Sequence, residues 1–68
     1  MSDAQWRTDL VVELRRLAAK MGGSGARMYT HGKARTDELF LKHGAELMRA
    51  GEMVEKWATE IKAEVRDV

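Results

Sequence analysis

The C-terminal stretch of the chain, residues 40–68, reads FLKHGAELMRAGEMVEKWATEIKAEVRDV. Apolar and small residues recur in it at alternating intervals of four and three positions, the seam of a heptad repeat, with no proline to interrupt it. The sequence therefore predicts one long helix. The residues on this seam are Phe40, Gly44, Leu47, Gly51, Val54, Ala58, Ile61, Val65 and Val68.

Large and small residues alternate along the seam. Gly44, Gly51 and Ala58 lie seven positions apart, and each is followed three positions later by a large apolar residue. Two glycines inside a helix cost about 1 kcal/mol each relative to alanine, so their regular placement indicates that another helix approaches closely there. The alternative is a helix broken at both glycines into segments 37–43, 45–50 and 52–66, resembling a helix-turn-helix. The uninterrupted seam favours the continuous helix.

A first, amphipathic helix is expected over residues 3–21. Ser2 and Gln5 have the spacing of a capping box, and Asp3 places negative charge at the positive end of the helix. The two glycines at positions 22 and 23 are expected to end it. Its apolar stripe consists of Leu10, Leu14, Leu17 and Met21.

Residues 22–35, GGSGARMYTHGKAR, are expected to form a Gly-rich basic loop. They contain four glycines and no acidic residue. Thr36 is then the predicted N-cap of the second helix, over residues 37–66.

These elements predict an all-α fold with a single domain, residues 1–68. It is a helical hairpin, in which two long antiparallel helices are joined by the loop. A first helix ending at Met21 is too short to cover the second, so Ile61, Val65 and Val68 are expected to project beyond it. A second copy covering them would give a four-helix bundle. The residues expected at this interface between copies are Phe40, Gly44, Leu47, Gly51, Val54, Trp57, Ala58, Ile61 and Val65.

Composition also favours self-association. A chain of 68 residues has room for only a small core, and the absence of cysteine excludes disulfides and cysteine-bound metals as supports.

The longest apolar runs have three residues, so we expect neither a signal peptide nor a membrane span and place the protein in the cytoplasm.

No catalytic motif is present. A phosphate-binding loop requires Gly, four residues and Gly-Lys-Ser/Thr after a strand, whereas Lys33 is followed by alanine. His43 and Glu46 have the spacing to share a helix face, but two ligands make a poor metal site. We therefore expect no enzyme, cofactor or metal.

One basic cluster remains a candidate for binding phosphate. No acidic residue occurs from Leu14 through Thr36, and glycine amides, arginine side chains and a tyrosine are components of nucleotide sites. A solvated loop after a helix C-terminus is often basic for reasons of the helix dipole alone. The candidate residues are Arg27, Tyr29, His31, Lys33 and Arg35.

Two functional hypotheses follow. The first is a small non-enzymatic regulatory module, of the adaptor or inhibitor type, that acts as a homo-oligomer and binds a partner protein. The alternative is a binder of nucleotide or nucleic-acid phosphates through the basic loop. A structural subunit whose only activity is assembly is a third possibility.

Overall fold

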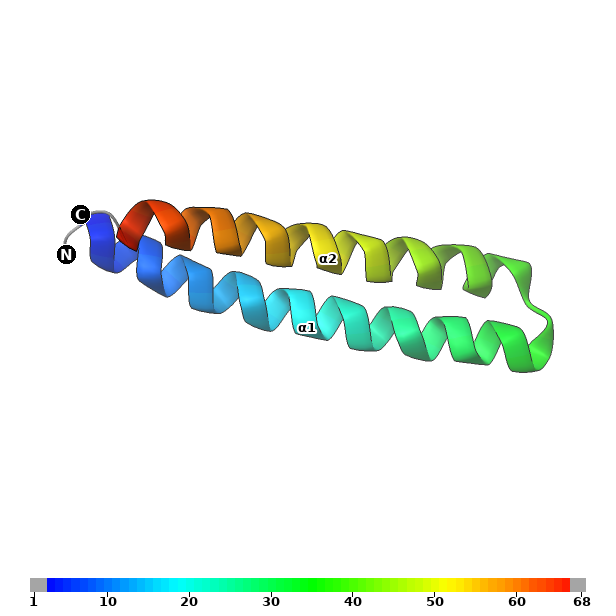
Figure 1. Cartoon of the computed structure of the whole chain (residues 1–68). Coiled ribbons are helices and arrows are strands. Elements are labelled where there is room, and N and C mark those ends of the chain that lie inside the picture. The colour runs from blue at the N-terminus through cyan, green and yellow to red at the C-terminus, as the bar shows by residue number, and fades with distance from the viewer. Residues whose placement is uncertain (1–2, 67–68) are drawn as a thin grey trace.

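The chain forms two long antiparallel helices packed side by side (Figure 1). The structure, a computed structural model, describes residues 3–66, with side chains for residues 3–64. Helix α1 spans Asp3–Arg35 and helix α2 spans Glu38–Arg66. The expected all-α helical hairpin is confirmed.

The predicted loop over residues 22–35 is wrong, because α1 continues through it to Arg35. Gly22 and Gly23 do not end the helix. Gly25 and Gly32 are buried against α2, and this tertiary contact offsets their poor helix propensity. The glycines of this segment therefore belong to the packing of a helix, and only the two residues between α1 and α2 make the connection.

The connection is a Schellman turn followed directly by a helix cap. Thr36 has a φ of 54°, and the Asp37 amide donates to the Gly32 carbonyl at 2.9 Å, as this motif requires. The Asp37 side chain then accepts from the Phe40 amide at 3.3 Å. Asp37, and not Thr36 as expected, is thus the N-cap of α2. Ser2, the predicted cap of α1, lies outside the described residues, while the Gln5 side chain donates to Asp9 at 3.0 Å.

Helix α2 is continuous from Glu38 to Arg66, so the alternative with breaks at Gly44 and Gly51 is wrong. Both glycines are buried. The predicted close contact exists, but the second helix that makes it is α1 of the same chain.

Helix α1 carries a matching seam. Its buried residues are spaced seven apart and alternate with half-buried Leu14, Met21 and Met28. Gly25 faces Gly44, and Ala18 faces Gly51. The same register places Val11 opposite Ala58, and these two side chains are 5% and 0% exposed. The buried residues of α1 are Val11, Ala18, Gly25 and Gly32.

The helix backbones touch where the glycines lie. A Cβ atom added to Gly44 would stand 2.6 Å from the Tyr29 amide nitrogen and 2.8 Å from the Gly25 carbonyl oxygen. A Cβ at Gly25 would meet the Gly44 carbonyl oxygen at 2.8 Å. These neighbours are backbone atoms, which cannot turn away as a side chain can. The separation of the two helices therefore depends on the lack of side chains at these positions.

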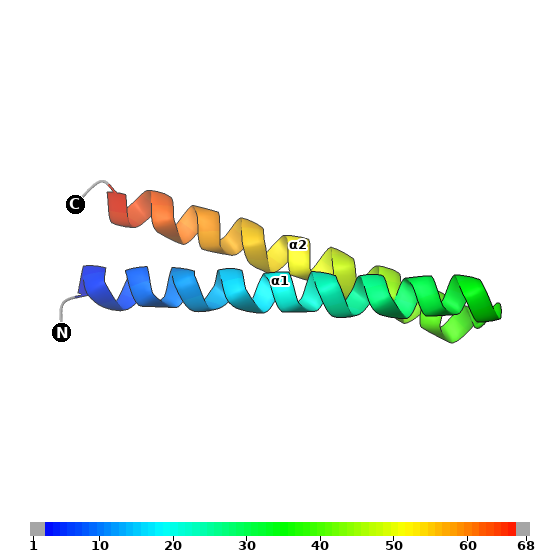
Figure 2. The ribbon, with the colours of Figure 1, turned by 90° about the horizontal axis from the view of Figure 1, so that it is seen from below.

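The longer α1 also changes the register expected from the sequence. Met21 lies beside Gly51 and not near Phe40. Ile61 is half-buried and does not project past α1, and Arg7 reaches Glu64 with an Nη1–Oε2 distance of 2.8 Å. The side chain of Val65 and all of Val68 lie outside the described part. The two helices cross at a shallow angle, which Figure 2 shows, as heptad-based packing favours.

The glycine contacts give a paired prediction. Gly44→Ala should lower the free energy of unfolding by about 1–3 kcal/mol, because the added methyl group forces the backbones apart. Gly22→Ala should raise it by about 0.5–1 kcal/mol, since nothing lies within 4 Å of the position that the new methyl group would take and alanine is the better helix former. Urea unfolding at one protein concentration, followed by circular dichroism, measures both. Equal effects of the two substitutions would contradict the close approach.

The connection gives a second prediction. Thr36→Gly should raise the free energy of unfolding by about 1 kcal/mol, because a β-branched residue is strained at positive φ and glycine is not. Thr30→Gly, the same change at an exposed position inside α1, should lower it by up to about 0.5 kcal/mol. Thermal unfolding of the two variants at equal concentration is the measurement. A stabilising Thr30→Gly or a destabilising Thr36→Gly would show that α1 does not end in this turn.

Candidate functional site

The hairpin has two broad sides, one on each side of the plane that contains both helix axes. Residues three positions after a small seam residue lie on one side, and residues four positions after it lie on the other. Because the helices are antiparallel, residues with the same offset share the same side in both helices. Leu14 of α1 and Ile61 of α2, for example, follow Val11 and Ala58 by three positions and therefore lie on one side together.

Contacts between the helices agree with this division. Arg15 and Glu55, each four positions after a small residue, approach each other with an Nε–Oε1 distance of 3.6 Å. On the other side, the rings of His31 and Phe40 lie 5.1 Å apart between centroids. Each broad side therefore has its own set of contacts between α1 and α2.

The side that carries Leu14 and Ile61 is apolar over most of its length. No Lys, Arg, Asp or Glu occupies it from Leu10 to Met28 in α1 or from Phe40 to Ile61 in α2. We call this surface the apolar face; it consists of Leu10, Leu14, Leu17, Met21 and Met28 of α1 and Phe40, Leu47, Val54, Trp57 and Ile61 of α2.

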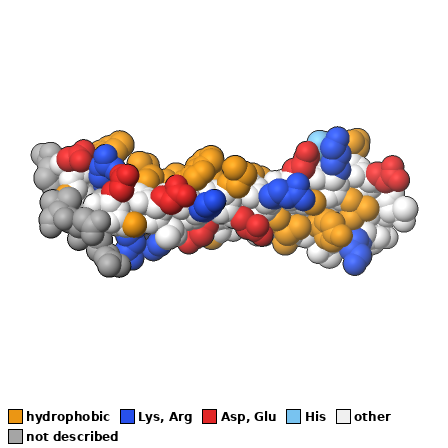
Figure 3. All heavy atoms as spheres, turned by 45° about the horizontal axis from the view of Figure 1, so that its top comes forward, with side chains coloured by type: hydrophobic (Ala, Val, Ile, Leu, Met, Phe, Trp, Pro, Cys, Tyr) orange, Lys and Arg blue, Asp and Glu red, His pale blue; other side chains and the backbone are white. Residues whose placement is uncertain are grey.

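Large side chains of the apolar face remain in contact with solvent. Leu17 and Trp57 are each 48% exposed, and Trp6 and Met53 at its margins are 56% and 52% exposed. No large side chain among the described residues is fully buried. Figure 3 looks mainly onto the outer surface of α2, where apolar side chains gather in separate stretches with charged groups between and beside them. Two helices alone do not cover these side chains.

The structure divides the residues predicted for an interface between copies into two groups. Gly44, Gly51, Val54 and Ala58 are buried within one chain, and the side chain of Val65 lies outside the described residues. Phe40 and Trp57 remain exposed, and Leu47 and Ile61 are half-buried. Only this second group, together with its apolar neighbours in α1, offers apolar surface to another molecule. The contribution of α1 was missed, because the predicted interface followed the seam of α2 alone.

The opposite side is more polar and slightly hollowed. A depression crosses the middle of the hairpin there, beside the Arg15–Glu55 pair, and Arg15 Nε makes no hydrogen bond within the described part of the chain. Its floor consists of small residues, because Ala18, Gly22 and Gly51 carry no side chain large enough to fill it. The depression is lined by Ala18, Ala19, Gly22, Met48, Gly51, Glu52 and Glu55.

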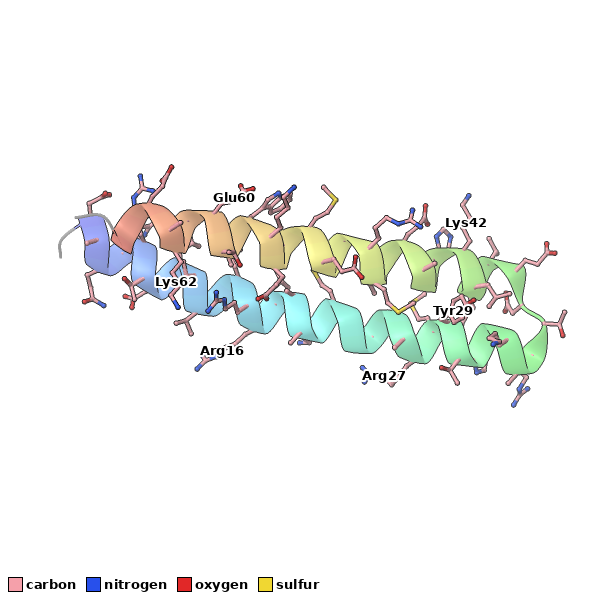
Figure 4. All side chains as sticks on the ribbon, viewed as in Figure 1. Arg16, Arg27, Tyr29, Lys42, Glu60 and Lys62 are labelled. Carbon is pink, nitrogen blue, oxygen red and sulfur yellow. The ribbon has the colours of Figure 1, made fainter. Side chains whose placement is uncertain are left out.

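The five residues of the candidate phosphate site do not converge. They occupy alternate positions of α1, and each step of two residues in a helix turns by about 200°. Arg27 projects away from α2, whereas Tyr29 lies beside it (Figure 4). His31 contacts Phe40, and Lys33 and Arg35 are exposed in the last turn of α1. The glycine-rich loop that was to gather them is a helix.

Most polar side-chain contacts among residues 3–64 join residues three or four positions apart, and Arg7–Glu64 and Arg15–Glu55 join the two helices. His43 Nδ1 lies 2.9 Å from Glu46 Oε1, so these two residues share a face as expected. No three His, Cys, Asp or Glu residues within 3–64 are placed to hold a metal ion. Hydrogen bonding to Asp3, with the charges of Asp3 and Glu64, raises the pKa of Arg7. Arg16 of α1 and Lys42 and Glu60 of α2 point outward, away from the other helix (Figure 4).

Comparisons with known proteins add no relative. Neither the protein-family models, nor the curated protein sequences, nor the solved structures contain a match to this chain. Among the described residues, neither helix has a stretch of sufficient length and apolar character to cross a bilayer. The two sides of the hairpin are therefore the basis for assigning a function.

Proposed function

We propose that the chain is a small non-enzymatic interaction module of the regulatory or adaptor type, which self-associates and binds a partner protein. The observation that supports this is the apolar face. It extends from Leu10 to Met28 of α1 and from Phe40 to Ile61 of α2 without Lys, Arg, Asp or Glu, and it exposes Leu17 and Trp57 by nearly half. Aromatic and aliphatic side chains grouped in this way are typical of protein interfaces.

The polar groups of the surface also support a binding role over a catalytic one. The His43–Glu46 pair is about half exposed on both side chains, whereas acid–base catalysis usually relies on groups held in buried surroundings. We place the module in the cytoplasm, since its surface combines many charges of both signs with a chain that has no cysteine.

Phosphate binding by the basic cluster has no structural observation in its favour. Its premise was a flexible loop whose glycine amides and cations close around one anion. In the helix, Arg27 and Tyr29 point in different directions, and the amides of this segment lie within the helix. The protein-binding proposal is therefore the one that the geometry supports.

A capture experiment with a matched pair of variants tests the proposal. The tagged full chain should recover a protein in stoichiometric amount from its native lysate, and Trp57→Glu should reduce that recovery at least about tenfold, since a buried unpaired carboxylate costs more than the roughly 1.4 kcal/mol that this factor represents. Ala63→Glu is the control, because Ala63 is exposed on the outer side of α2.

Three outcomes of the capture experiment count against the proposal. They are recovery of nucleic acid alone, recovery of no protein other than the chain itself, and equal recovery by the wild type and both variants.

A further inference from the structure

We propose that a second copy of this chain covers the apolar face, so that two hairpins pack face to face as a symmetric four-helix dimer. The inference rests on the proposed function only in assigning the apolar face to protein contact. It adds the occupant and names the surface of α1 that takes part, which the α2 seam alone does not contain.

The broad side that carries the apolar face is large enough for a dimer of this kind. The Cα atoms extend over 50 × 16 × 11 Å, and the product of the two longer extents is a projected area of about 800 Å². A standard protein interface buries about 800 Å² on each partner. The broad side of one hairpin therefore matches what one side of a stable interface requires.

The charge of the face fits a copy of itself. A surface with no Lys, Arg, Asp or Glu between Leu10 and Met28 or between Phe40 and Ile61 has no charge for a partner to complement. In a two-fold symmetric dimer, the apolar face of one copy contacts the apolar face of the other. An apolar face is self-complementary in this sense, whereas a face with charges of one sign repels its own copy.

The core of the single hairpin also favours a second copy as the molecule that covers the apolar face. The buried hydrophobic residues among those described are Val11, Ala18, Val54 and Ala58, all of them small or medium in size. The large side chains Leu14, Met21, Leu47 and Ile61 are only half covered. They occupy the heptad positions that form the core when four helices pack together. A second hairpin completes this core using only side chains that the chain already carries.

The test compares oligomeric state and tryptophan environment in the full chain and two matched variants. Leu17 and Val12 are both apolar, both on α1 and 48% and 45% exposed; Leu17 lies on the apolar face and Val12 on the opposite side. Light scattering after size exclusion should give twice the chain mass of 7.7 kDa for the wild type and for Val12→Glu. Leu17→Glu should give the single chain mass, or a dimer at least about tenfold weaker.

A second measurement on the wild type keeps the proposal falsifiable if Leu17→Glu does not fold. The melting temperature of a dimer rises with protein concentration, and tryptophan emission should shift to shorter wavelength over the same range as Trp57 becomes covered. A wild type that stays at 7.7 kDa with a melting temperature independent of concentration overturns the proposal. So does a dimer that Val12→Glu disrupts and Leu17→Glu does not.

The result separates the dimer from the wider function. A monomeric chain whose capture of another protein is lost in Trp57→Glu would overturn the dimer, and with it the self-association in the proposed function, and would leave the binding of a partner protein standing. A dimer that captures no other protein would do the reverse.

Discussion

The structure depends on direct contact between the backbones of α1 and α2. At Gly25 and Gly44, the space that a Cβ atom would occupy is already taken by backbone atoms of the facing helix. Dispersion contacts over such a surface are individually small, but they accumulate along the length of the hairpin because each seven-residue repeat adds another pair of small residues. The glycines thus stabilise the packed hairpin, although each of them would destabilise its helix in isolation.

This close approach determines what the rest of the molecule presents to solvent. When the seam consists of small residues, the large apolar side chains beside it are displaced to the two broad sides. Leu14, Met21 and Ile61 consequently line one side without being enclosed. The close packing of the two helices leaves no core of large, enclosed side chains within one chain. The apolar face is the direct result.

The sequence predicts part of this arrangement. The seam of α2 alternates large and small residues without a break, so its continuity and its need for a close partner helix were predictable from Gly44, Gly51 and Ala58. Residues 22–35 were not predicted correctly, because local propensity at Gly22 and Gly23 favours an end to the helix. The signal that would have corrected this is the phase of Gly25 and Gly32, which continue the seven-residue spacing of Val11 and Ala18. The expectation that the basic cluster converges rested on the same predicted loop.

The two-residue connection has a consequence for how the helices choose their alignment. Small residues recur every seven positions in both seams, so sliding α2 by two helical turns would again set glycine against glycine, with Gly32 facing Gly44 and Gly25 facing Gly51. The packing surfaces alone would therefore fit almost equally well in either alignment, because both seams repeat every seven residues. The turn at Thr36 selects one alignment, because a two-residue connection is too short for the helices to pack in a slipped one. In this chain the seam sets the distance between the helices, and the turn sets which residues of α1 face which residues of α2.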